Sequence, residues 1–194
     1  MAIRSLKNGT FSRSLLVGNS YYIPPAYEWI ASATATGGET TLSFSSIPAT
    51  YKHLQIRLRF NLTGSNNIFA RFNGSSSALY IDHRLRGDGS TVSAGSPGAG
   101  QTEWLYTSVG YPTSAGNFGY SIIDIHNYAN TSQNKTVRVF HGYDTNGADG
   151  QQIALTSALW INTAAINSIS FTPGAGNSFK ANSKIMLFGI KAGA

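Results

Sequence analysis

The side chains that could carry acid–base or metal chemistry are few and scattered in this sequence. It has eight acidic residues and four histidines among 194 residues, and no cysteine. The closest groupings are Asp124 with His126, two positions apart on one expected strand face, and Asp82 with His83, followed by two arginines. A catalytic or metal site needs three or more such groups to converge. We therefore predict a chain that is not an enzyme and that has no catalytic, cofactor-binding or metal-binding residues.

A second candidate for chemistry is the acidic, glycine-containing segment 144–150 (DTNGADG). It offers oxygen ligands around a turn, as a calcium loop does, but it lacks the ordered ligand positions and the terminal Glu of an EF-hand. Asn-Gly between two strand patterns is also the strongest short-range signal of a β-hairpin. We therefore predict a hairpin turn here and no cofactor.

Aromatic residues are the third candidate, because 12% of the chain is Phe, Trp or Tyr. Most should fill the core or lie between subunits, with tyrosine hydroxyls reaching a polar partner. Three that lie close in sequence, Trp104, Tyr106 and Tyr111, are candidate surface contacts for a sugar ring. A carbohydrate-binding module is accordingly an alternative function of a different class.

The elements that must position these residues are β-strands. In the segment 52–63, five apolar residues alternate with five polar ones, which predicts a strand with one face on a core and one in water. No segment keeps a helical period. Shorter strand patterns are expected at 29–36, 40–45, 67–73, 77–85, 101–109, 118–128, 136–143, 151–161, 166–172 and 184–191.

Turn-forming residues separate these patterns, among them Asn73-Gly74 and Pro173-Gly174. The glycine-rich stretch 87–100 is expected to be the longest loop. Many short strands joined by Gly, Ser and Asn turns are typical of a two-sheet sandwich. We predict an all-β, antiparallel, jelly-roll-like sandwich domain over residues 28–194.

Residues 1–27 lack a sustained period of either kind and end near Pro24-Pro25, which favours extended backbone. They are predicted to form an N-terminal anchoring arm that docks on other subunits; the alternative is that the arm packs on its own sandwich as an extra edge strand. The arm combines positive charge with apolar side chains that have nothing of their own to cover. The residues expected to bind the partner are Ile3, Arg4, Leu6, Lys7, Phe11, Arg13, Leu15 and Leu16.

The net charge of +6 would favour nucleic acid if it were concentrated, but only 11% of residues are charged and no basic block is interleaved with aromatics. We therefore expect no nucleic-acid partner. The longest apolar run in residues 1–20 has three residues, too short for a signal peptide, and no stretch is long enough to span a membrane. These observations predict synthesis in a cytoplasm and no membrane partner.

Four segments of the sequence together resemble a family of small virion structural proteins from tailed bacteriophages, especially aquatic and marine phages. They are 3–19 (IRSLKNGTFSRSLLVGN), 45–60 (SSIPATYKHLQIRLRF), 83–90 (HRLRGDGS) and 185–193 (IMLFGIKAG). The resemblance spans the chain, but these strings carry no chemistry that would define a role.

The resemblance implies a jelly-roll protein of the virion, made in the host bacterial cytoplasm and exposed on the particle as a tail-fibre or baseplate appendage that contacts the host surface. Capsid decoration, as a cement protein, is the alternative within this class. The resemblance also implies a homo-oligomer, expected to be a trimer. Its partners would be other tail or capsid proteins and, for a host contact, a surface glycan. A hydrolase of surface polysaccharide is disfavoured because the acids are scarce and unclustered.

Overall fold

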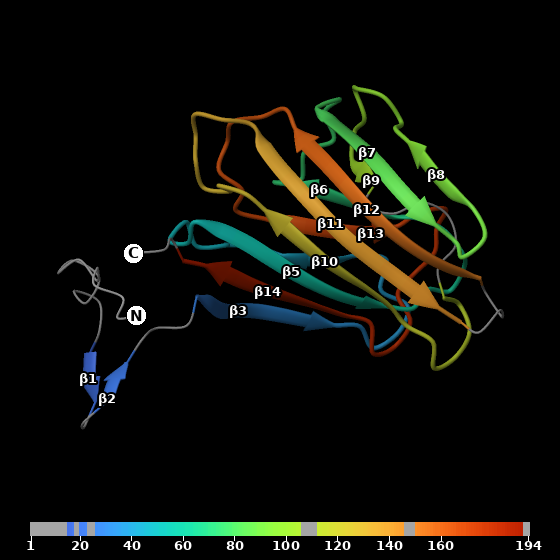
Figure 1. Ribbon diagram of the computed structural model, residues 1–194, viewed down its shortest axis with the longest axis horizontal. Helices are drawn as coiled ribbons and strands as arrows, with labels where there is room; N and C mark the ends of the chain where they lie inside the picture. The colour runs from blue at the N-terminus through green and yellow to red at the C-terminus, as the bar shows by residue number, and fades with distance from the viewer. Residues whose placement is uncertain (1–14, 18–19, 23–25, 106–111, 146–149, 192–194) are drawn as a thin grey trace, which may run out of the picture.

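Strands account for all the regular secondary structure in the part of the chain that the computed structural model describes, residues 15–17, 20–22, 26–105, 112–145 and 150–191. Two antiparallel sheets pack against each other (Figure 1). The predicted all-β, antiparallel, two-sheet sandwich is thus confirmed. No helix in these residues has the length and apolar character needed to cross a membrane.

The larger sheet has eight strands and extends across the sandwich. Every neighbouring pair in it is antiparallel. In the order in which they pair, its strands are β3 (Tyr27–Thr34), β14 (Lys184–Ile190), β5 (His53–Phe60), β10 (Gly119–Ile125), β11 (Lys135–Asp144), β12 (Gln151–Trp160), β7 (Tyr80–Gly87) and β8 (Val92–Gly95).

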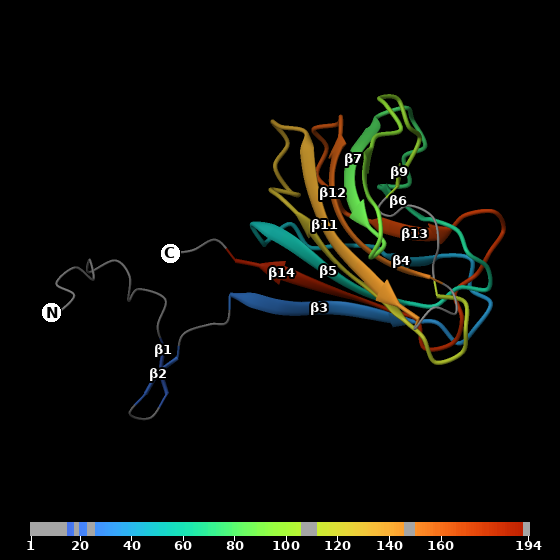
Figure 2. The same ribbon diagram turned by 45° about the vertical axis from the view of Figure 1, so that its right-hand side comes forward.

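The smaller sheet packs against one face of the larger one (Figure 2). Its strands, in order, are β4 (Leu42–Phe44), β13 (Ile169–Pro173), β6 (Ile68–Phe72) and the two-residue β9 (Trp104–Leu105). The chain passes from one sheet to the other at each step from β3 to β7, and again from β12 through β13 to β14. This repeated crossing agrees with the predicted jelly-roll-like topology, although the division into eight and four strands is unequal.

The core lies between the two sheets and is built by the alternation seen in the sequence. On β5, Leu54, Ile56 and Phe60 are fully buried, whereas Arg57 between them is exposed. Phe171 on β13 meets this layer from the smaller sheet and is also fully buried. Each such side chain contributes roughly 1.5–3 kcal/mol when it leaves water, so alternation at period 2 is enough to fix which face of the strand turns inward.

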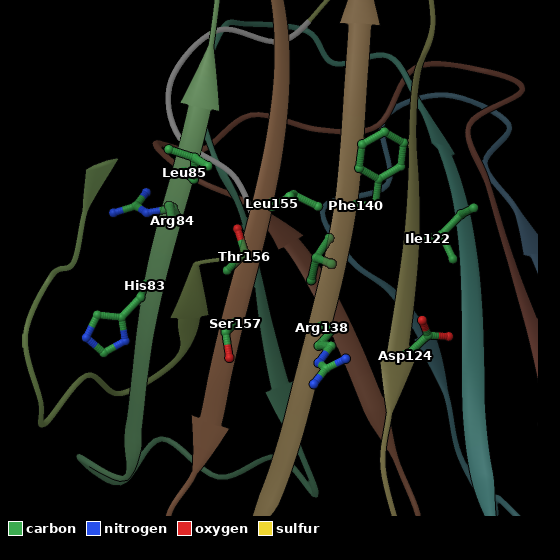
Figure 3. Close-up of a pocket in the computed structure, with 11 residues that line it drawn as sticks. His83, Arg84, Leu85, Ile122, Asp124, Arg138, Phe140, Leu155, Thr156 and Ser157 are labelled. Atoms are coloured by element: carbon green, nitrogen blue, oxygen red, sulfur yellow. The ribbon is translucent and has the colours of Figure 1, made fainter. Parts of the chain in front are cut away.

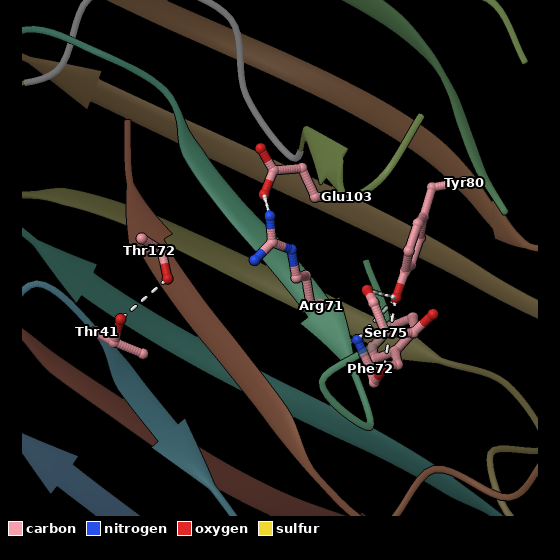
Figure 4. Close-up of polar contacts among 7 residues, drawn as sticks. All are labelled: Thr41, Arg71, Phe72, Ser75, Tyr80, Glu103 and Thr172. Carbon is pink, nitrogen blue, oxygen red and sulfur yellow. Dashed lines mark hydrogen bonds and ion pairs between the residues drawn. The ribbon is translucent and has the colours of Figure 1, made fainter. Parts of the chain in front are cut away.

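Four aromatic rings form the centre of the β6, β7 and β12 part of the core. The ring centroid of Phe72 lies 5.5 Å from Trp160, 5.9 Å from Trp104 and 6.3 Å from Tyr80. The Tyr80 hydroxyl donates to the Ser75 carbonyl and accepts from the Phe72 amide, so the buried phenol keeps its polar partners (Figure 4). Trp104 is only 1% exposed. The prediction that its ring contacts a glycan at the surface is therefore wrong.

Two polar contacts hold the smaller sheet at its outer side (Figure 4). The Arg71 guanidinium on β6 lies 2.8 Å from the Glu103 carboxylate, beside β9. The hydroxyls of Thr41 and Thr172 are 3.1 Å apart and join the chain before β4 to β13. Both contacts lie near the surface, where such pairs contribute little to stability but fix which strands are neighbours.

The stretch 87–100 is not one long loop, because it contains β8. A tight turn joins β7 to β8: the Asp88 carboxylate accepts from the amides of Ser90 at 2.9 Å and Thr91 at 2.7 Å. These hydrogen bonds lower the pKa of Asp88. The strand escaped prediction because Ser93, Ala94 and Gly95 carry no apolar alternation.

The two edges of the larger sheet are β3 and β8. β8 has only four residues, and the pairing of β3 with β14 shifts register between Leu187 and Phe188, as at a β-bulge. Both features shorten the regular edge that another strand could extend.

Within the predicted arm, the structure describes one hairpin. β1 (Leu15–Val17) pairs with β2 (Ser20–Tyr22), and the two form a separate two-stranded sheet that shares no ladder with the sandwich. Leu15 and Leu16 thus lie on a strand. The other arm residues expected to bind a partner, Ile3, Arg4, Leu6, Lys7, Phe11 and Arg13, lie outside the described residues.

Candidate interaction surface

The face of the larger sheet that turns away from the smaller sheet carries a row of apolar side chains across β10, β11, β12 and β7. Ile122 is paired with Phe140, Phe140 with Leu155, and Leu155 with Leu85. Residues paired directly across strands lie on the same face of a sheet. Their side chains are 41%, 49%, 54% and 51% exposed in the order Ile122, Phe140, Leu155 and Leu85. We call these four residues the outer apolar row.

On β10 and β11 the apolar row on the outer face is backed by apolar residues on the inner face. Ile123 and Val139 lie next to Ile122 and Phe140 in the sequence and are buried in the core. A strand with one face in water normally places polar residues on that face. The prediction from sequence missed the outer apolar row, although the adjacent apolar pairs Ile122-Ile123 and Val139-Phe140, which break the alternation, are the signal that could have revealed it.

A polar row lies beside the outer apolar row, one step along the strands. Asp124 is paired with Arg138, Arg138 with Ser157, and Ser157 with His83. The Asp124 carboxylate also accepts from the side-chain amide of Gln55 at 2.9 Å. We call Asp124, Arg138, Ser157 and His83 the outer polar row.

On the other side of the outer apolar row, large and small residues alternate. Tyr120 is paired with Gly142, Gly142 with Ile153, and Ile153 with Gly87. Tyr120 is 60% exposed and Ile153 is 54% exposed. We call these four residues the outer mixed row.

The outer apolar and polar rows line a hollow of about 600 Å³ on this face of the sheet. Figure 3 shows Leu85, Leu155, Phe140 and Ile122 at one level of it, and His83, Ser157, Arg138 and Asp124 at the next. The hollow thus presents an apolar band beside a polar band that carries one carboxylate, one guanidinium and one imidazole. A surface of this kind is suited to bind another protein surface.

The part of the same face over β14 and β5 is different, because it combines aromatic and basic side chains. The Arg57 guanidinium lies 4.7 Å from the ring centroid of Phe188, and that of Arg59 lies 3.7 Å from the ring centroid of Phe118. Trp29 on β3 is paired with Phe188 and is 62% exposed. It is the most exposed tryptophan in the described part of the chain.

The inner face of β7 and β11 holds the most strongly buried ionisable groups. Asp82 and Arg84 form an ion pair with 3.2 Å between Oδ1 and Nε, and the Asp82 side chain is 1% exposed. His141 is stacked on Phe60 with 6.0 Å between ring centroids. Burial lowers the pKa of His141 to about 4, although a hydrogen bond with Gln152 raises it in part. The imidazole is therefore neutral near pH 7.

The acid and histidine pairs picked out in the sequence do not come together into one site. Asp82 is buried on the inner face while His83 is exposed on the outer one. Asp124 belongs to the outer polar row, whereas the His126 ring packs against that of His53, with 5.2 Å between centroids. Among the residues that the structure describes, no group of three or more His, Cys, Asp or Glu could hold a metal ion.

Three further predictions concern residues that the structure does not describe or describes in part. Tyr106 and Tyr111, the other candidate glycan contacts, lie outside the described residues, as does the tip of the segment 144–150. The strands on either side of that tip, β11 and β12, pair as a hairpin through Asp144 and Gln151.

Comparison of the chain with known proteins adds no relative to this description. No family model matches it, and neither the curated proteins nor the solved structures include a match. Function is therefore inferred from the chemistry of the outer face and from the sequence.

Proposed function

We propose that this protein is a non-enzymatic structural component of a tailed-phage virion, anchored by its N-terminal arm and exposed on the particle. The observation that carries the assembly role is the outer apolar row, four half-exposed apolar side chains at the centre of a sheet. The resemblance of the four sequence segments to phage virion proteins supports the choice of particle. Within the particle, a tail-fibre or baseplate appendage that touches the host surface is the proposed place, and capsid decoration is the alternative.

The energetic argument concerns what a partner would gain from this face. Burying the exposed half of each side chain in the outer apolar row contributes roughly 1 kcal/mol per residue. The strands below are held on both sides by ladders of the larger sheet, so little ordering would oppose that gain. Such a face is suited to permanent contact within an assembly.

Deletion of residues 2–20 tests the anchoring part of the proposal. The domain from residue 28 onward should remain folded, with an unchanged far-ultraviolet circular dichroism spectrum and a cooperative melt, but should be missing from purified particles. Mass spectrometry of the particles measures incorporation, and labelling of a C-terminal tag in electron micrographs separates tail from capsid.

Two matched variants of the full chain separate the kinds of anchor. One replaces Arg4, Lys7 and Arg13 by Ser, and the other replaces Ile3, Leu6 and Phe11 by Ser. Because ordering an arm needs apolar burial on the partner, the second variant should lose incorporation more completely than the first. An unfolded deletion product, or a deleted protein that still joins particles, would contradict the proposed anchor.

Carbohydrate binding is the second candidate function, and Trp29 is the observation that favours it. The exposed indole ring of Trp29 lies beside Phe188, and the Arg57 guanidinium lies over the Phe188 ring. Together they offer a stacking surface next to hydrogen-bond donors. A glycan array probed with the purified protein tests this function. Binding that Trp29→Ala abolishes, while deletion of residues 2–20 leaves it unchanged, would favour the binding module over the anchored virion protein.

A further inference from the structure

We infer that the outer face of β10, β11, β12 and β7 binds the same face of a second copy of this chain, around a two-fold axis that runs parallel to the strands between β11 and β12. The inference rests on the proposed assembly role and names the partner of its apolar face. Its evidence is the self-complementarity of three neighbouring rows of side chains.

The symmetry operation determines which strands meet. A two-fold axis in the plane between two stacked sheets, parallel to the strands, lays β11 of one copy over β12 of the other and β10 over β7. It moves no residue along the strand direction, so each row meets the same row of the second copy. Aligned stacking of this kind, with sheets about 10 Å apart, is the usual geometry of β-sandwiches.

The outer apolar row matches itself under this operation. Phe140 lies over Leu155 of the second copy, on each side of the axis, and Ile122 lies over Leu85. The hollow of about 600 Å³ shown in Figure 3 is lined by these residues and lies under the proposed contact. The four most suitable side chains for burial thus become the centre of the contact.

The outer polar row matches itself in charge. Asp124 faces His83 of the second copy, an acceptor opposite an imidazole that can donate. Arg138 faces Ser157, a hydroxyl that can accept its hydrogen bond. No two like charges are directly opposite each other in this row, and the two Arg138 side chains, which lie on either side of the axis, each face a Ser157 hydroxyl.

The outer mixed row matches itself in size. Ile153 lies over Gly142 of the second copy, and Tyr120 lies over Gly87. Each large side chain therefore meets a position that has none. Alternation of large and small residues between facing layers is what close packing of two sheets requires.

The other two-fold axis that could stack these faces runs across the strands, and it fails the same comparison. It would exchange the polar and mixed rows, so that Asp124 would face Tyr120 and Ser157 would face Ile153. Polar side chains buried against apolar ones lose hydrogen bonds to water without gaining a partner, which is costly. Under the axis parallel to the strands, the three outer rows match those of a second copy in apolar character, charge and size. This match favours a second copy as the partner of this face.

Cysteine cross-linking tests the position of the axis, because the natural chain has no cysteine that could interfere. In the double variant I122C/L85C the two thiols of one copy are three strand spacings, about 14 Å, apart, too far for a short thiol-to-thiol reagent to join them. In the proposed dimer, the thiol at position 122 of each copy faces the thiol at position 85 of the other copy, which gives two facing pairs. Most of the double variant should therefore run as a covalent dimer under denaturing conditions, and a mixture of the two single variants should cross-link as well.

Each single variant alone should stay monomeric on the same gel, since like positions are again about 14 Å apart across the axis. Cross-linking of either single variant as efficient as that of the double variant, or none in any sample, would overturn the proposal. Circular dichroism of each variant confirms that the fold is kept, which is expected because both side chains are about half exposed.

A charge at the centre of the contact provides the second measurement. Leu155→Arg should weaken dimerisation about a hundredfold in sedimentation equilibrium, because it buries two unpaired guanidinium groups per dimer. Ile161→Arg is the matched control: this side chain is 42% exposed but lies just beyond the end of β12, and the variant should dimerise like the natural chain.

The outcomes separate the contact from the proposed function. A natural chain that is monomeric, or a trimer whose I122C/L85C variant forms no cross-link between copies, would overturn the two-fold contact. Arm-dependent incorporation into particles would still support the virion role. Dimers with the predicted cross-link from a protein that is missing from particles would support the contact and contradict the virion role.

Discussion

The two faces of the larger sheet carry similar residues in opposite surroundings. On β10 and β11, Ile123 and Val139 point toward the smaller sheet and are at most 2% exposed, whereas Ile122 and Phe140 beside them are 41% and 49% exposed. On β5 the same comparison gives a different result, because its outer face carries Arg57 and Arg59 rather than apolar residues. The sheet is therefore apolar only on its inner face at β5, and apolar on both faces at β10 and β11.

The sandwich core therefore does not account for all the apolar residues of the strands. The smaller sheet covers one face, and the remaining apolar residues are gathered into paired positions on the other instead of being dispersed. Single exposed apolar residues are common on protein surfaces and need no explanation, but a contiguous row marks an interaction site. Three predictions test the difference between the two faces.

The largest effect is expected from truncating a ring that packs against the inner face, that of Phe72 on β6 of the smaller sheet. Phe72→Ala should lower the free energy of unfolding by about 3–5 kcal/mol, because it leaves a cavity among Tyr80, Trp104 and Trp160. Phe140→Ala on the outer face should cost the monomer no more than about 1 kcal/mol, since the ring is already half exposed. Urea denaturation at a concentration where the protein is monomeric measures both.

Equal losses from the two variants would show that the outer ring is as much a part of the fold as the inner one. The contrast between the faces would then have no energetic basis.

A smaller effect is expected from acid, through His141 on the inner face. The pKa of this imidazole is about 4 in the folded protein and near 6.5 when unfolded, so the unfolded chain takes up a proton first as pH falls. The stability that depends on a neutral His141 is complete above about pH 6.5 and is lost as pH falls toward 4, by roughly 3 kcal/mol in all. Unfolding free energies measured from pH 7 to pH 4 should follow this decline.

The variant His141→Gln should be less stable than the natural chain at pH 7 but should show a shallower decline with acid. His83→Gln on the outer face is the control for replacing an exposed histidine, measured at a concentration where the protein is monomeric. A decline of the same depth in His141→Gln would assign the acid sensitivity to other groups.

The smallest effect should separate the contact from the fold. In Gly142→Val the added Cβ would lie 3.5 Å from its nearest neighbour, the Gln152 carbonyl oxygen, so the monomer should keep its stability within about 0.5 kcal/mol. The new side chain would occupy the place that Ile153 of the second copy needs, which should weaken dimerisation about tenfold. Sedimentation equilibrium and thermal melts measure the two quantities.

Gly95→Val on β8 is the matched control, because no atom lies within 4 Å of its added Cβ and it belongs to none of the three outer rows. It should leave both quantities unchanged. A Gly142→Val protein that dimerises normally would show that this position is not covered by a second copy.

Most strands could be predicted from the sequence because alternation at period 2 is a direct consequence of strand geometry, as on β5. β8 could not, since its residues carry no apolar pattern and its pairing with β7 depends on the turn at Asp88. Trp104 was misjudged because a two-residue strand gives no alternation from which burial can be read. The outer apolar row was missed because an apolar residue next to a core residue reads as irregular alternation, and only the pairing of four strands shows that such residues share one face.

The short β8 and the register shift between Leu187 and Phe188 affect how copies of the protein can associate where they are crowded together, as on a particle surface. A broad sheet with two regular rims could recruit strand after strand and polymerise without end. Because one edge strand is only four residues long and the other is irregular, strand addition at the edges is suppressed. Self-association is then directed to the outer face of the sheet, where a two-fold contact closes after a single step.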